Sequence, residues 1–167
     1  MFVVEKFTGT KEELHEELLR QAQGLLADER DLIANAANLS ALIWQLVPDL
    51  NWAGFYFMKE GGLVLGPFQG KPACVRIPVG KGVCGTSVLR RQTMLIEDVH
   101  AFPGHIACDS ASNSELVVPI LHSGDVHGVL DLDSPLKARF DAQDQKGFER
   151  LVAAFVACTD FPSLAKK

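Results

Sequence analysis

The chain has 167 residues, of which 47% are hydrophobic and 22% charged, and its formal net charge is -5. This composition is typical of a globular protein with its own core and excludes a disordered or fibrous chain. The negative charge argues against a nucleic-acid partner, because binding to phosphates is driven by clustered lysine and arginine. We expect a single domain over residues 1–167.

Targeting signals are not apparent at the N-terminus. Glu5 interrupts it before any apolar run of signal-peptide length, and no apolar run of about eighteen residues follows anywhere. We therefore expect a cytoplasmic protein with no membrane partner. The four cysteines are too few, in a chain without a secretory signal, to indicate a disulfide framework for stability.

Helical periodicity marks the first part of the chain. Thr10 and Glu13 have the spacing of a capping box, and apolar residues at helical intervals then predict a helix over 11–26. A second apolar stripe predicts a helix over 32–46, which Pro48 ends.

From Asn51 the apolar pattern has a period of two, which predicts strands. Gly66-Pro67 is expected to break the second of them, and a short helix is expected over 86–91. The short strands that we expect after the first one lie at 63–65, 75–79 and 94–96.

The clearest hairpin joins 116–120 to 126–133 through Ser123-Gly124-Asp125. A last helix is expected over 141–159, with Cys158 on its apolar stripe as a packing residue. Terminal helices and hairpin-linked strands predict an α+β fold, an antiparallel sheet with helices on one face and a ligand pocket on the other. The segments are N-terminal helices (1–50), sheet and loops (51–140) and C-terminal helix (141–160).

The segment 105–115 has the composition of a loop that carries functional residues, because it is rich in polar side chains and poor in apolar ones. It contains His105 and Cys108. A thiolate is a strong nucleophile when its neighbours lower its pKa, so Cys108 is the candidate nucleophile. The alternative is that Cys108 is a small buried apolar residue.

The glycine pattern and the cysteine spacing are weaker evidence for a function. Gly80 to Gly85 matches the dinucleotide-binding pattern, but the expected hairpins do not supply the parallel strands which that fold needs. The same turn can instead hold an anion on its backbone N–H groups. No cysteine pair has zinc-ligand spacing, so we expect no metal.

Three carboxylates are expected to meet at one end of the hairpin. Asp131 and Asp133 share one face of their strand, and a three-residue loop at 123–125 places Glu115 opposite Asp133 and Val117 opposite Asp131. Like charges this close favour a bound cation or a retained proton, and a retained proton suits a general acid. The alternative is that these acids only solvate a strand end.

Several motifs together resemble the free methionine-(R)-sulfoxide reductases, enzymes built on a lone GAF domain. The resemblance runs from about Asn51 to Asp160. Its motifs are Asn51-Trp52-Ala53-Gly54-Phe55-Tyr56, Gly66-Pro67-Phe68-Gln69-Gly70, Ala73-Cys74, Gly82-Val83-Cys84-Gly85, Glu97-Asp98-Val99-His100, Gly104-His105-Ile106-Ala107-Cys108-Asp109, Ser112-Asn113-Ser114-Glu115 and Gly128-Val129-Leu130-Asp131-Leu132-Asp133-Ser134.

The resemblance implies that Cys108 attacks the sulfoxide sulfur and becomes a sulfenic acid. Cys84 and Cys74 are the resolving candidates, which the sequence does not rank. Trp52 and Tyr56 are implied to wall the pocket. The residues implied to contact the substrate are Glu115, Asp131 and Asp133.

The implied substrate is free methionine (R)-sulfoxide, and the implied reductant is thioredoxin. No metal or organic cofactor is required, and a homodimer is an assembly that the family allows. We hypothesise that one of the three carboxylates protonates the departing oxygen, because an oxide is a poor leaving group. The rival functions are a GAF ligand sensor without catalysis, a nucleotide-dependent oxidoreductase and a thiol-based redox sensor.

Overall fold

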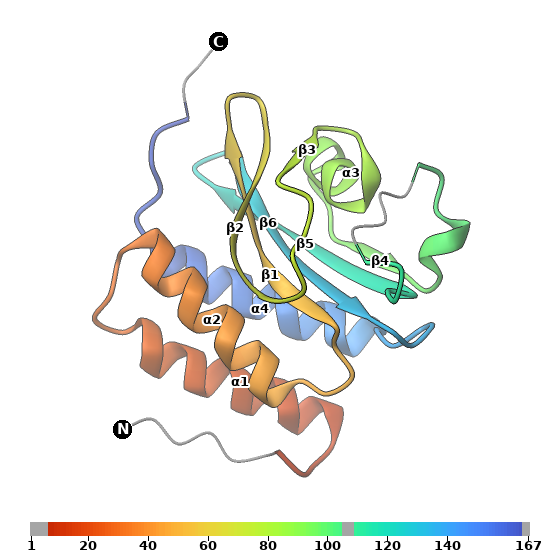
Figure 1. The fold of residues 1–167 in the computed structure, drawn as a ribbon. Coiled ribbons are helices and arrows are strands. Elements are labelled where there is room, and N and C mark those ends of the chain that lie inside the picture. Colours follow the sequence, from red (N-terminus) through yellow and green to blue (C-terminus); the bar gives the residue numbers. More distant parts are fainter. Residues whose placement is uncertain (1–6, 105–108, 165–167) are drawn as a thin grey trace.

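The computed structural model describes residues 7–104 and 109–164. Its centre is a six-stranded sheet in the order β3-β2-β1-β6-β5-β4, in which all neighbouring strands are antiparallel (Figure 1). The α+β expectation is confirmed. The strands are β1 (Trp52–Lys59), β2 (Gly62–Gly70), β3 (Arg76–Pro78), β4 (Met94–Ile96), β5 (Ser114–His122) and β6 (Asp125–Ser134).

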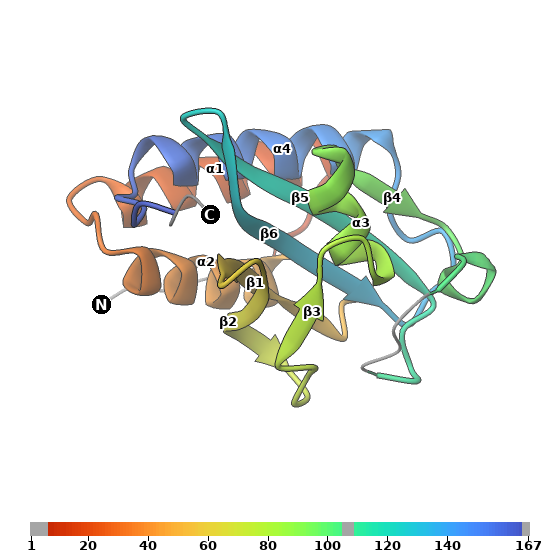
Figure 2. The same ribbon diagram turned by 90° about the horizontal axis from the view of Figure 1, so that it is seen from above.

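Three long helices form a layer on one side of this sheet, as Figure 2 shows from a second direction. They are α1 (Lys11–Leu26), α2 (Leu32–Leu46) and α4 (Ala142–Ala157). Helices α2 and α4 lie on the strands, and α1 packs on both helices. In the described part of the chain, no helix has the length and apolar character needed to cross a bilayer.

Local signals explain where these helices begin. The capping box is formed, since the Glu13 N–H donates to the Thr10 side chain and the Thr10 N–H donates to Glu13. Asp31 caps α2 by accepting two backbone N–H groups. Both N-terminal helices therefore cover the residues predicted for them. Their apolar stripes join the sheet in the larger of two hydrophobic cores.

Strand β1 separates the two cores because its side chains alternate. Phe55 and Phe57 pack in the core under the long helices, while Trp52 and Tyr56 belong to a smaller core on the opposite face. The short helix α3 (Gly82–Arg90) covers that opposite face and contributes to the smaller core. The 3₁₀ turn η1 (Val99–Ala101) follows β4.

The β5–β6 register is the predicted one, with Glu115 paired to Asp133 and Val117 to Asp131. The loop, however, is not the predicted three residues. His122 pairs with Asp125, which leaves a two-residue turn, and the register shifts by a bulge next to the turn. A two-residue turn plus one bulged residue gives the same register as a three-residue loop.

Several other boundaries differ from the prediction. Strand β2 continues through Gly66-Pro67 to Gly70, because an irregularity in its pairing with β1 accommodates the dipeptide. Helix α3 begins at Gly82, four residues before the predicted start at 86, so its first turn includes Cys84. The predicted strand 75–79 is shortened to Arg76–Pro78.

Candidate active site

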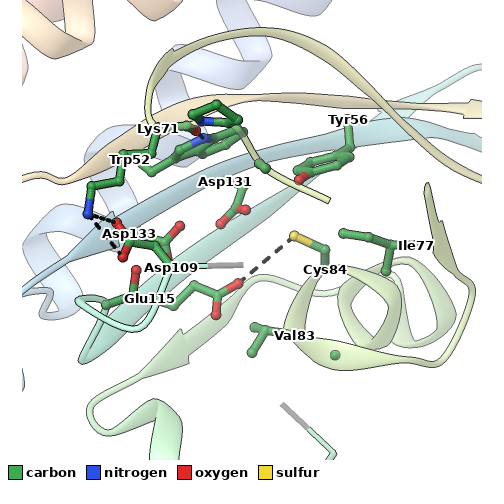
Figure 3. A pocket seen from close by; sticks show the side chains of 14 residues that line it. Trp52, Tyr56, Lys71, Ile77, Val83, Cys84, Asp109, Glu115, Asp131 and Asp133 are labelled. Atoms are coloured by element: carbon green, nitrogen blue, oxygen red, sulfur yellow. Dashed lines mark hydrogen bonds and ion pairs between the residues drawn. The ribbon is translucent and has the colours of Figure 1, made fainter. Parts of the chain in front are cut away.

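A cavity lies on the face of the sheet opposite the long helices (Figure 3). It is enclosed by β1, β5, β6, the first turn of α3 and the connection from β2 to β3. About 40 Å³ of it is open to water-sized molecules. Of the eight residues predicted for the site, those that line this cavity are Trp52, Tyr56, Cys84, Glu115, Asp131 and Asp133.

The strand register brings the three predicted carboxylates together. Asp131 and Asp133 point to the same side of β6, and Glu115 on β5 is the paired neighbour of Asp133. Glu115 and Asp131 are 5% and 6% exposed, while Asp133 is partly exposed. Charged groups of this kind are rarely buried without a partner of opposite charge.

Burial raises the pKa of Glu115 well above its usual range, and the charge on Asp133 raises it further. Burial likewise raises the pKa of Asp131, with Glu115 as the next cause. The pKa of Asp133 is raised by burial and then by Asp131. The three carboxyl groups, which we call the acid cluster, therefore hold protons at a pH where surface carboxyl groups have lost them.

Aromatic side chains form the wall above the acid cluster. The rings of Trp52 and Tyr56 are stacked at 5.7 Å between centroids, and the Phe68 ring also stacks on Trp52, at 5.2 Å. Tyr56 donates its hydroxyl hydrogen to the Cys74 carbonyl, and Trp52 donates its indole N–H to the Lys71 carbonyl. The aromatic wall therefore also holds the β2–β3 connection over the cavity.

The cysteines differ in state and position. Cys84 is buried and free, and burial followed by the charges of Asp131 and Glu115 raises its pKa, so it remains a thiol. Cys74 is disulfide-bonded and lies next to Ala73, which lines the cavity. Cys158 is a free, partly buried residue packed against the larger core, as predicted. The predicted nucleophile Cys108 lies outside the described residues, as does His105.

Three polar residues that the sequence interpretation gave no role lie at the mouth of the cavity. Lys71 and Asp109 line it and form an ion pair at 3.3 Å between Nζ and Oδ2. Asn51 donates from Nδ2 to Asp109 and to Ser112. Asn51 and Asp109 stood within motifs of the family resemblance, but no spacing rule connects residues from three separate segments.

The first turn of α3 borders the cavity through Gly82, Val83 and Cys84. Its N-cap, Lys81, makes no side-chain cap hydrogen bond, and no acidic residue stands in the first turn. The N-terminus of a helix carries partial positive charge and N–H groups without intrahelical partners. The predicted anion-binding turn therefore faces the acid cluster from the other side of the cavity.

The glycines of this turn have a structural purpose that does not involve a nucleotide. Gly80 has a φ of +81°, and a Cβ on Gly85 would lie 2.4 Å from the Pro78 carbonyl oxygen. The Gly80 N–H donates to the Gly85 carbonyl across this close contact at 2.8 Å. The glycines therefore let α3 pack tightly on its preceding turn, in a sheet without the parallel strands of a dinucleotide fold.

Three comparisons place these features among known proteins. A GAF domain family model matches residues 36–157. The free methionine-R-sulfoxide reductase of Escherichia coli is 52% identical over 154 residues, covering 90% of this chain and 93% of that protein. The Saccharomyces cerevisiae protein of the same name is 45% identical over 149 residues, covering 84% and 83%.

Among solved structures, the X-ray structure of free methionine-R-sulfoxide reductase from Neisseria meningitidis in complex with its substrate is similar to this fold. The TM-score is 0.90 at 40% sequence identity, and the match covers 94% of this chain and 95% of that chain.

Proposed function

The chain belongs to the free methionine-R-sulfoxide reductases of the GAF domain family, and we propose that it reduces free L-methionine (R)-S-oxide to methionine. The observation that carries the proposal is the acid cluster, which lines a cavity beside an aromatic wall on the face of the sheet opposite the long helices. A protonated acid beside an apolar wall suits a substrate with a basic oxygen next to an S-methyl group.

In the proposed first step, the Cys108 thiolate attacks the sulfoxide sulfur while an acid-cluster carboxyl group protonates the oxygen. A bond forms between the Cys108 sulfur and the substrate sulfur as the S–O bond breaks and the oxygen leaves as hydroxide. This hydroxide then attacks the Cys108 sulfur, the S–S bond breaks, methionine leaves with its electron pair, and Cys108 is left as a sulfenic acid. We assign the donor role to Glu115, a buried carboxyl group whose pKa is raised by burial and then by Asp133.

In the proposed second step, the Cys74 thiol attacks the sulfenic sulfur, water leaves, and a Cys74–Cys108 disulfide forms. The disulfide-bonded state of Cys74 supports it as the resolving thiol, since Cys84 and Cys158 are both free. Cys84 is also a poor candidate because its pKa is raised by burial and by Asp131. A thioredoxin dithiol then reduces the disulfide by exchange, which fits the reducing conditions of a cytoplasm.

Both charged ends of a free amino acid find partners around the cavity. We place the substrate ammonium at the acid cluster and its carboxylate at the N-terminus of α3. Lys71 is the less suitable carboxylate partner, because it is 71% exposed and already paired with Asp109. A methionine sulfoxide within a peptide has neither charge, so the site excludes it.

The test is NADPH consumption through thioredoxin and its reductase with free R-sulfoxide, free S-sulfoxide and a peptide sulfoxide. We expect turnover of the free R form alone. Equal rates on the three compounds, or none on the R form, contradict the proposal. A chemical dithiol in place of thioredoxin separates failure of the reductant from failure of the chemistry.

Two cysteine variants locate the reaction. Cys108→Ser is expected to abolish turnover, while Cys158→Ser, the matched control, retains it because Cys158 packs away from the cavity. Sulfoxide binding by the wild type without turnover would instead support the ligand sensor.

A further inference from the structure

The buried thiol of Cys84 has no part in the proposed reaction, yet its sulfur lies within the acid cluster. Its Sγ donates a hydrogen bond to Oε1 of Glu115 at 3.9 Å. One carboxylate oxygen each from Glu115 and Asp131 and the Cys84 sulfur all lie within 4.8 Å of one another, and all three residues are buried. Figure 3 shows the three side chains converging from α3, β5 and β6.

A second observation indicates that this group lacks a ligand. Asp131 is 6% exposed, and its Oδ1 is a buried atom without a hydrogen-bond partner among the described residues. A buried carboxylate oxygen left unpaired is costly, and native structures rarely leave one without a compensating ion, water or proton. Asp131 faces the Cys84 sulfur and Glu115 across the cavity.

We propose that Cys84, Glu115 and Asp131 form a binding site for a thiophilic divalent cation of the Zn²⁺ type. One thiolate and two carboxylates are three of the ligand types that zinc takes, and water or a substrate group completes a tetrahedron. Ligand atoms about 3.5 Å apart surround a tetrahedral zinc with the usual bond lengths. The three ligand atoms, which lie within 4.8 Å of one another, would therefore have to move closer together around the ion. Mg²⁺ and Ca²⁺ fit poorly, because they need six or more oxygen ligands.

Charge and space agree with this assignment. Binding of M²⁺ with loss of the ligand protons converts a cluster of like-charged groups into one of formal charge about -1. No oxidation or reduction is involved. The 40 Å³ of open space is room for an ion and one or two water molecules, since each water occupies roughly 10–15 Å³ on this measure.

This inference goes beyond the proposed reductase function, on which it rests. A cation bound at this site would inhibit the reduction of methionine sulfoxide and would not act as a cofactor. The cation occupies the carboxylates that are proposed to hold the substrate ammonium and to supply the proton. Cation and methionine sulfoxide therefore exclude each other. The ligands come from three elements distant in sequence, which is why cysteine spacing indicated no metal.

The experiment is a Co²⁺ titration of chelator-treated, oxidised full-length protein, followed by the near-ultraviolet sulfur-to-cobalt charge-transfer absorption. Among the described residues, the free thiols are those of Cys84 and Cys158. We expect one band, lost in Cys84→Ser and retained in the matched control Cys158→Ser. Asp131→Asn should raise the Kd for Co²⁺ at least about tenfold, since even outer-shell changes cost that much. No band, or a band that survives in Cys84→Ser, overturns the proposal.

Displacement of Co²⁺ from the wild-type protein gives a second measurement, which does not depend on whether any variant folds. Free methionine added to the wild-type cobalt complex is expected to remove the charge-transfer band, and Zn²⁺ in equal amount should remove it as well. A band that persists in saturating methionine places the metal elsewhere and overturns the proposal. Turnover by the chelator-treated enzyme tests the reductase function separately, so the two proposals can fail independently.

Discussion

The molecule buries acidic side chains in two regions, and the two are built in opposite ways. Asp144, in the first turn of α4, is fully buried among Lys11, His15 and Arg139, with contacts of 2.6, 3.0 and 3.3 Å to its carboxylate oxygens. The acid cluster on the other face has like charges as neighbours. Burial opposes ionisation of Asp144, but its hydrogen bonds, first that with His15, lower its pKa to about 2.

The comparison distinguishes Asp144, which stabilises the contact between α1 and α4, from the acid cluster, which we propose binds a ligand. Asp144 joins α1 to α4, and a Cβ on Gly147 would lie 2.2 Å from the His15 ring, so the packing there admits no larger residue. The acid cluster contains an unpaired oxygen on Asp131 and raised pKa values caused by burial and mutual repulsion. We interpret the acid cluster as a proposed binding site in which a cationic ligand would offset the lost stability.

The largest expected effect comes from neutralising one member of the acid cluster. Asp131→Asn should lower the rate of methionine formation in a single turnover by roughly 10²–10⁴-fold, the range typical of lost general acid–base and charge contacts. The matched control is Asp125→Asn, an exposed carboxylate at the start of the same strand, which should leave the rate unchanged. Equal rates for Asp131→Asn and wild type, measured by rapid quench with chelator present, would remove the cluster from the chemistry.

Asp144→Asn should lower the free energy of unfolding by about 3 kcal/mol at neutral pH, because it removes the charge of the buried carboxylate that pairs with Lys11, His15 and Arg139. Activity per folded molecule should stay at the wild-type level. The control is Glu16→Gln, which breaks the exposed Arg150 ion pair between the same two helices and should lower stability much less than Asp144→Asn does. Urea unfolding measures both, and equal losses would show that burial of the pair is irrelevant.

The difference in stability between the wild type and Asp144→Asn should depend on pH, and the pKa of Asp144 determines the direction. The folded-state pKa of Asp144 is lowered to about 2 from 3.8. Its contribution is therefore present above pH 4 and is lost as the pH falls through 2. It amounts to roughly 2.5 kcal/mol at 1.36 kcal/mol per pKa unit. The gap between wild type and Asp144→Asn should close on acidification from pH 5 to pH 2, and a gap that widens would reverse the assignment.

Asp131→Asn is expected to change stability less than Asp144→Asn does, and in the opposite direction: it should stabilise the protein. Removing one of the repelling carboxyl groups should stabilise the metal-free protein at pH 7, because burial and then the charge of Glu115 raise the pKa of Asp131 in the folded state. Urea unfolding in the presence of a chelator measures it. A loss of stability would indicate that Asp131 is satisfied in solution as fully as Asp144 is.

The smallest effect is expected at Lys71, which is a cation at the cavity mouth but an exposed one. Lys71→Met should change KM for the free R-sulfoxide by less than about twofold, because the substrate carboxylate is assigned to the N-terminus of α3. Steady-state kinetics with the free sulfoxide measures it. A tenfold rise in KM would move the carboxylate to Lys71.

Sequence patterns were sufficient for much of the fold. The capping box, the apolar stripes and the period of two predicted α1, α2 and β1, and the hairpin register placed Glu115 opposite Asp133. The continuous course of β2 through Gly66-Pro67 was missed, because an irregularity in pairing is a property of two strands together. The early start of α3 was missed because its first residues are glycine and cysteine, which carry no strong helix signal.

The candidate site was predictable where residues share a strand or a hairpin, as for Asp131 and Asp133. It was not predictable where segments distant in sequence meet. The Lys71–Asp109 ion pair and the Cys84 thiol beside Glu115 both depend on how the β2–β3 connection and α3 fold over the sheet. No local pattern reports a contact of that kind.

The central claim is that a buried carboxyl group protonates the sulfoxide oxygen as the Cys108 sulfur attacks. Two rates measured in the Glu115→Gln variant provide the test. The first is the rate of methionine formation in a single turnover, and the second is the rate at which iodoacetamide alkylates Cys108. We expect methionine formation to slow by at least about 100-fold and the rate of alkylation to be unchanged. Methionine formation at the wild-type rate, or a parallel loss of both rates, would contradict it.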